Sequence, residues 1–221
     1  GAHSFHPYAS ETGIIEELRL ENQVRNPQRS AAYWDLVLWE AVHFHPDIRL
    51  LLNTTMDSVR ADSGLVRSVS CWQMTTQTRF EIEGGLFVDC TGDGTLGYLA
   101  GNPWRRGQEA RPEYDESMAS PDPLPYTMGS SLLFQGRDMG RPVPFVPPEW
   151  AYSYPTHESM GRDPRRPEYG YWWIEWGGML DIIKDDDRIR EELLKVLMGV
   201  WDHLKNHGDH SAENWALDWC G

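Results

Sequence analysis

The stretch that decides the fold is Leu86-Phe87-Val88-Asp89-Cys90-Thr91-Gly92-Asp93-Gly94, which continues into Thr95-Leu96-Gly97-Tyr98-Leu99-Ala100. Apolar residues lead into a Thr-Gly-Asp-Gly turn and then a helical segment, as in a buried parallel strand that ends at a helix. At such junctions backbone N–H groups meet a phosphate or nucleotide. Gly92 and Gly94 have no side chain to keep a ligand from the backbone. We therefore predict a nucleotide-binding loop. An ordinary strand-to-helix turn capped by Asp93 remains the alternative.

Two helices and a second strand are predicted ahead of this loop. Apolar spacing predicts a helix over residues 14–24, and Ser30 is a suitable N-cap for a helix that ends at His43. The short apolar run Ile48–Asn53 predicts a buried strand. A helix followed by such a strand is half of a βαβ unit, and the strand before that helix would precede Gly1.

Between the two predicted parallel strands the hydrophobic period changes. Residues 65–83 alternate much as antiparallel strands do, with Asp62-Ser63-Gly64 and Thr75-Thr76-Gln77 as the expected turns. The sequence thus predicts a small antiparallel meander as the crossover between two parallel strands.

Charge and composition narrow the classes of function. The 221 residues carry a net charge of −14 and no cluster of Lys and Arg, so we expect no nucleic-acid partner. No apolar run is long enough for a membrane span. The 3 cysteines are too few and too far apart for a disulfide framework or a CxxC metal site.

Both ends of the chain favour an internal fragment of a longer protein. It begins at Gly1 without Met and ends at Gly221 after a Trp-rich run. A cytoplasmic location is the default expectation, whereas a secreted or periplasmic one stays open. The sequence does not predict the oligomeric state.

The second half of the chain differs in composition from the first. Residues 102–122 are polar and predict a connection, residues 130–135 predict a strand, and residues 185–205 predict an amphipathic helix. In the aromatic segment 171–176 a strand would alternate its side chains between two faces. One face would carry Tyr171, Trp173 and Glu175, which suits a wet cleft that stacks on a flat substrate or a sugar ring. The other, Trp172, Ile174 and Trp176, would be core. Core packing of most of these aromatic residues is the alternative.

Three histidines stand at the end of the last predicted helix. His203 and His207 are four residues apart, and His210 follows. Zinc would suit that spacing. However, the sequence offers no evident further ligand, and histidine is favourable at a helix C-terminus in any case. We therefore predict no metal site.

Together these features resemble bacterial FAD-dependent oxidoreductases of the two-dinucleotide-binding-domain type, related in their flavin domain to the heterodisulfide reductase A subunit. The resemblance rests on residues 15–22, 87–101 and 170–178. It implies an α/β fold in which residues 1–104 form a partial FAD/NAD(P)-binding, Rossmann-like domain with an antiparallel meander crossover. Residues 105–221 would form part of an α+β substrate or cap domain.

The resemblance also implies FAD as cofactor and assigns residues to its site. The loop residues that would approach FAD are Asp89, Thr91, Gly92, Asp93 and Gly94. The backbone at Met56 would meet the adenine, and His3 and His6 are weak catalytic candidates near the flavin ring. The family's first strand, with its Gly-x-Gly-x-x-Gly and acidic residue for the ribose, has no counterpart here. The cysteine ligands of the reductase relatives are also missing, so no iron–sulfur cluster is carried over.

The predicted function is hydride transfer between a small-molecule substrate and flavin, with a sugar as one candidate substrate. This activity is expected of the full-length protein, and the isolated fragment is expected to be inactive. The alternative is a non-catalytic carbohydrate-binding or lyase-associated domain, which the Trp-rich, acidic second half would suit.

Overall fold

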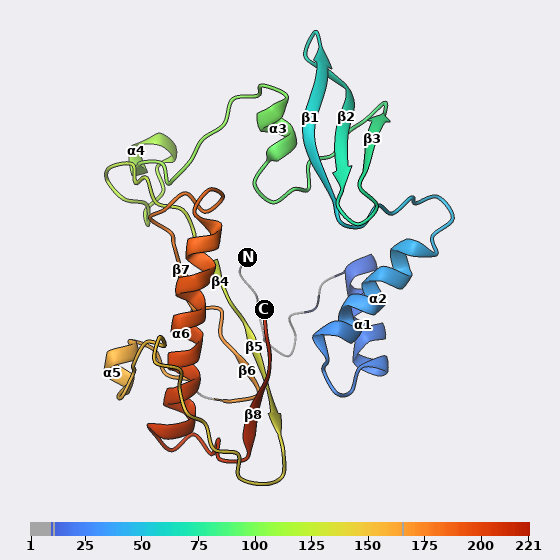
Figure 1. The fold of residues 1–221 in the computed structure, drawn as a ribbon. Helices are drawn as coiled ribbons and strands as arrows, with labels where there is room; N and C mark the ends of the chain where they lie inside the picture. Colours follow the sequence, from blue (N-terminus) through green and yellow to red (C-terminus); the bar gives the residue numbers. More distant parts are fainter. Residues whose placement is uncertain (1–9, 11, 165) are drawn as a thin grey trace. The chain divides into compact units, whose positions relative to one another are not determined.

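The computed structural model describes Ser10, residues 12–164 and residues 166–221 (Figure 1). The chain divides into two compact units, Gly1–Trp104, here the first unit, and Arg105–Gly221, the second unit. Among the described residues, no helix has the length and apolar character needed to cross a membrane.

The first unit opens with two helices, α1 (Ile14–Arg25) and α2 (Ala31–His43). Ser30 caps α2 as predicted, because its hydroxyl accepts a hydrogen bond from the Tyr33 N–H at 3.3 Å. The buried Asn26 side chain holds the turn between the helices by bonding both the N–H and the carbonyl of Ser30, at 2.8 Å each. Both helices therefore follow from local sequence signals.

A three-stranded antiparallel meander follows, made of β1 (Thr54–Asp62), β2 (Leu65–Gln73) and β3 (Thr78–Glu83) in that order. The predicted turns are confirmed: the first contains Ser63 and Gly64 at positive φ, as a tight hairpin turn requires. The meander begins earlier than predicted, because β1 lies in a segment to which the sequence assigned no strand. The five-residue helix α3 (Thr95–Leu99) packs on β1.

The two predicted parallel strands are wrong for the described residues. Neither residues 48–53 nor residues 86–90 form a strand, and Leu86 and Val88 are 84% and 72% exposed. Every strand pair in the described part of the chain is antiparallel. An apolar run forms a strand only where a partner strand completes its backbone hydrogen bonds. The hydrophobicity of the run does not show whether such a partner strand is present. The described fold is a mixed α/β arrangement with antiparallel sheets.

The second unit combines two small antiparallel sheets with one long helix. Its strands are β4 (Ser130–Ser131), β5 (Phe134–Asp138), β6 (Tyr169–Gly170), β7 (Glu175–Trp176) and β8 (Trp215–Cys220). One sheet pairs β4 with β7, and the other has the order β6-β5-β8. The helices are α4 (Arg111–Tyr114), α5 (His157–Met160) and α6 (Asp186–Asn206). The predicted long helix is confirmed as α6, whereas the predicted strand over 130–135 is split between β4 and β5.

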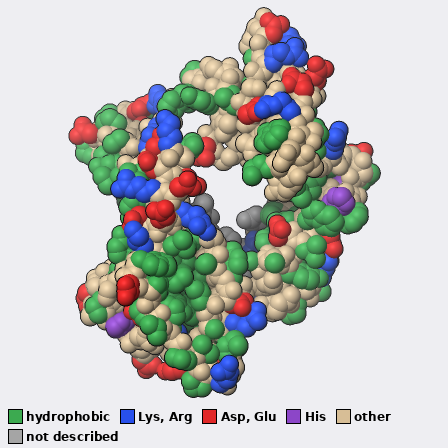
Figure 2. Space-filling model, viewed as in Figure 1, with side chains coloured by type: hydrophobic (Ala, Val, Ile, Leu, Met, Phe, Trp, Pro, Cys, Tyr) green, Lys and Arg blue, Asp and Glu red, His purple; other side chains and the backbone are tan. Residues whose placement is uncertain are grey.

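The core of the second unit lies under α6. Most of the apolar stripe of the helix is buried, and it packs on Phe134, whose ring meets Trp201 edge-on at 5.3 Å. Gly170 passes so close to Phe134 that a Cβ there would lie inside the ring's van der Waals surface. Other hydrophobic side chains stay outside the core and gather on the visible face of this unit (Figure 2).

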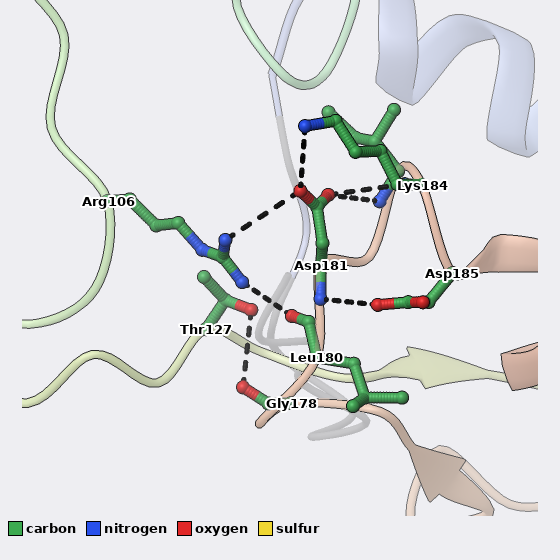
Figure 3. A network of polar contacts seen from close by, with 8 residues as sticks. Arg106, Thr127, Gly178, Leu180, Asp181, Lys184 and Asp185 are labelled. Atoms are coloured by element: carbon green, nitrogen blue, oxygen red, sulfur yellow. Dashed lines mark hydrogen bonds and ion pairs between the residues drawn. The ribbon is translucent and has the colours of Figure 1, made fainter.

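Polar contacts join the start of α6 to the segment that leads into β4 (Figure 3). The Asp181 carboxylate accepts hydrogen bonds from the N–H groups of Lys184 and Ile183 at 3.2 Å, and these bonds lower its pKa. The Arg106 guanidinium donates to the Leu180 carbonyl at 2.6 Å. The network holds the turn before α6 in place.

Candidate functional site

The Thr-Gly-Asp-Gly loop (Thr91–Gly94) is held by the carboxylate of Asp89. One carboxylate oxygen of Asp89 accepts hydrogen bonds from the N–H and the hydroxyl of Thr91, at 3.1 and 2.7 Å. The other accepts from the N–H of Gly97 at 3.0 Å. The Thr91 hydroxyl in turn accepts from the Thr95 N–H at 2.8 Å. The loop and the first turn of α3 are thus tied together by two side chains.

These bonds set the charge of the loop. The Thr91 hydroxyl, followed by the N–H groups of Gly97 and Thr91, lowers the pKa of Asp89 below its usual value. Asp89 therefore keeps its negative charge to a lower pH than an ordinary aspartate does. The charged Asp89 carboxylate is used in the hydrogen bonds that hold the loop.

Gly92 and Gly94 are needed for backbone conformation. Their φ angles are +87° and +70°, a region that residues with a Cβ rarely adopt. A Cβ built at either position would meet no atom of the described chain within 4 Å. Both glycines therefore leave open space above the backbone.

The alternative interpretation, in which Asp93 caps the helix, is wrong, and the loop contains a glycine motif that the sequence prediction did not include. Asp93 does not cap α3, whose first N–H groups are bonded by Thr91 and Asp89 instead. Gly92, Gly94 and Gly97 also stand at Gly-x-Gly-x-x-Gly spacing, a signal present in the sequence. The fingerprint binds pyrophosphate only after a strand and on free helix N–H groups. Here no strand precedes it, and the N–H groups of Thr95 and Gly97 are already occupied.

Met56 lies inside β1, where it pairs with Cys71 of β2, and not just past a buried strand as expected. It packs on a small cluster of the buried residues Val69, Cys71 and Leu96. Leu96 belongs to α3, the helix that directly follows the loop, so Met56 and this helix pack on the same small cluster.

The aromatic segment of the second unit does not form one strand. A hydrogen bond of 3.0 Å from the Ile174 N–H to the Tyr171 carbonyl closes a turn between β6 and β7. Ile174 is core as predicted and Trp176 is partly buried against it, but Trp172 is 64% exposed. Alternation fails because a turn does not send successive side chains to opposite faces.

The side chains predicted to contact substrate instead stack on or bond to other residues of the second unit. Tyr171 stacks on Trp173 at 4.8 Å, and its hydroxyl donates to the Arg166 carbonyl. Burial raises the pKa of Tyr171 to about 12. Glu175 accepts a hydrogen bond from the Gly129 N–H at 2.9 Å. The polar groups of Tyr171 and Glu175 thus have internal partners.

The remaining candidates are histidines. His3 and His6 lie outside the described residues. His207 bonds the carboxylate of Asp202 at 3.1 Å. His203 and His210 instead lie beside His157, which the sequence did not single out, because no spacing signal connects residues so far apart in the chain.

Comparison with known proteins places the chain in the class of flavin-dependent redox proteins. A model of the FAD-dependent oxidoreductase family matches residues 4–219, nearly the whole chain. The chain therefore belongs to the FAD-dependent oxidoreductase family, and its cofactor is FAD. The match supports a flavin-linked redox function and does not support the carbohydrate-binding or lyase-associated alternative. No curated protein and no solved structure matched the chain.

Proposed function

We propose that this chain acts in hydride transfer between a small-molecule substrate and FAD, and that the Thr-Gly-Asp-Gly loop contacts the hydroxyl-bearing part of the cofactor. The observation that carries the proposal is an exposed carboxylate, that of Asp93, between two glycines with open space above them. Asp93 has no hydrogen bond to the described residues, so it is available to a ligand. Bound FAD supplies the group that accepts or donates the hydride.

The residues present fit one part of FAD and not another. A carboxylate only accepts hydrogen bonds, so Asp93 suits ribityl or ribose hydroxyls and would repel a phosphate. The first N–H groups of α3 are used by Asp89 and Thr91, so α3 is not a pyrophosphate site. In this proposal Asp89 and Thr91 shape the loop, and Gly92 and Gly94 let the cofactor approach the backbone.

Two further assignments belong to the same proposal. β1 is an edge strand, so one side of its backbone faces no other strand of its sheet. We propose that the backbone at Met56 meets the adenine along that edge. We further propose that residues 1–104 serve as the FAD-binding part and residues 105–221 as the substrate or cap part of a bacterial protein related to the heterodisulfide reductase A flavin domain.

The experiment is an NMR titration of the isotopically labelled 221-residue chain with FAD. We expect weak binding, because no free helix N-terminus in the loop holds the pyrophosphate. Shifts should concentrate at residues 89–97 and Met56. Gly92→Val should abolish them, because a β-branched side chain fills the approach to the backbone and cannot adopt positive φ without strain.

Gly64→Val is the matched control. Gly64 also has positive φ (+79°) and open space, but it lies in the turn between β1 and β2. This variant should carry the same strain and keep the FAD shifts. Shifts confined to other residues, or equal loss in both variants, would show that the loop does not contact FAD.

A further inference from the structure

Three histidines of the second unit, His157, His203 and His210, point ring nitrogens toward one another; we call them the histidine cluster. One ring nitrogen from each lies within 4.8 Å of the other two. The ring centroids are 5.0, 5.3 and 5.1 Å apart, so the rings form a nearly equilateral triangle. The cluster joins the first residue of α5, the last turns of α6 and the loop after α6.

His203 is the fully buried member of the cluster. Its Nδ1 lies 2.5 Å from the backbone carbonyl of Tyr154. A carbonyl can only accept, so Nδ1 carries the proton and Nε2 of the neutral ring is left with a bare lone pair. His203 Nε2 is buried and has no hydrogen-bond partner among the described residues. Buried polar atoms are nearly always satisfied, so this one indicates a missing ligand.

The other two members are spaced as ligands of one ion would be. His157 Nε2 and His210 Nε2 are 3.4 Å apart. Two nitrogens bound tetrahedrally to zinc at their usual bond lengths are about 3.3 Å apart. His157 is exposed and His210 partly buried, so an ion could reach the cluster from solvent. The bond from His203 Nδ1 to a carbonyl is the kind of contact that orients metal-bound imidazoles.

We propose that the histidine cluster binds one Zn²⁺ ion, or a chemically similar divalent transition-metal ion, through His157, His203 and His210. Imidazole nitrogen is a preferred donor for these ions. Within the described residues the cluster contains three protein ligands, which leaves the fourth tetrahedral position to water or an exchangeable ligand. The ion would tie α5 to the C-terminal end of α6. This proposal does not depend on the proposed flavin site.

The surroundings of the cluster include two carboxylates, which favour a bound cation. Burial, followed by the neighbouring His203 and His157, lowers the pKa of His210. The carboxylates of Asp163 and Asp209 act on His210 in the opposite direction. They therefore supply negative charge near the place where a cation would sit.

The test is a Co²⁺ and Zn²⁺ titration of the metal-stripped, full 221-residue chain without a polyhistidine tag. We expect one equivalent of Co²⁺ with visible ligand-field absorption, displacement by Zn²⁺, and a higher melting temperature with Zn²⁺. His157→Gln and His210→Gln should each weaken binding by roughly 100-fold or more. These partly exposed positions keep the test decisive even if His203→Gln does not fold.

Two further variants test whether metal binding depends on the geometry of the cluster. A Cβ at Gly208 would lie 2.7 Å from His210 Nε2, so Gly208→Ala should displace that ring and weaken binding although every ligand is kept. His207→Gln removes a nearby histidine outside the cluster and should leave binding unchanged. Absence of stoichiometric binding, full binding by His157→Gln, or equal loss in His207→Gln would overturn the assignment.

Discussion

Gly170 of the second unit and the loop glycines Gly92 and Gly94 of the first unit serve different physical purposes. In the second unit the chain passes so closely over its own core that Gly170 leaves no room for a Cβ beside Phe134. In the first unit, Gly92 and Gly94 have nothing near them and are required by positive φ alone. The surrounding cores differ in the same way. Trp201, Phe134 and Ile174 are fully buried, whereas the first unit has a small cluster around Leu96 and leaves Leu86 exposed.

This contrast distinguishes a glycine that packing requires from glycines that backbone conformation requires. Where a Cβ would collide with the chain, the fold itself explains the glycine. Where no atom lies near a glycine, its positive φ explains why the residue is glycine. The open space then lets another molecule approach the backbone. The Thr-Gly-Asp-Gly loop belongs to the second kind, which is why the FAD proposal concerns the first unit.

The largest effect should come from the core under α6. Trp201→Ala should destabilise the second unit by roughly 3–5 kcal/mol, because it removes a fully buried indole and leaves a cavity. Trp172→Ala is the control and should cost about 0.5 kcal/mol or less, since Trp172 is largely exposed. Hydrogen exchange resolved by segment measures both and shows whether the first unit changes. Similar losses in the two variants would contradict the assigned core.

A smaller effect should separate the two kinds of glycine. Gly170→Ala should cost about 3 kcal/mol, because the buried Phe134 ring has nowhere to move. Gly94→Ala should cost only about 1 kcal/mol, the strain of a left-handed backbone without a steric clash. Chemical denaturation of both variants tests the order. If Gly94→Ala proves the more damaging, the space above the loop is not open.

The smallest effect should be a pH dependence confined to the loop. The folded pKa of Asp89 lies below its ordinary value of 3.8, so its hydrogen bonds stabilise the loop above that pH. That stabilisation should disappear as the pH falls through the folded pKa. The protection of the Gly97 N–H, measured by NMR as its exchange rate relative to that of a free amide at the same pH, should decrease with acidification. Asp89→Asn should show no such step, and a step that persists in this variant would assign it to another group.

One long helix of the second unit and the meander of the first unit could be predicted because their signals are local. The helix now called α6 shows its apolar stripe, its acidic start and its final glycine within one short stretch. The meander shows its turns and its alternation in the same way. The aromatic segment could not be predicted, because the turn from Tyr171 to Ile174 arises from how β6 and β7 pair with different strands.

The sequence alone determined which residues can cap, turn and alternate, because capping, positive φ and periodicity depend on near neighbours. It identified Ser30, the hairpin turn at Gly64 and the Thr-Gly-Asp-Gly loop. Only the tertiary structure decided that the apolar runs at 48–53 and 86–90 form no strands. It also decided that the N–H groups of Thr95 and Gly97 at the start of α3 are already bonded and not open to a phosphate. Only it brought His157 to His203 and His210. Strand partners and ligand clusters join residues far apart in the chain, and packing places them together.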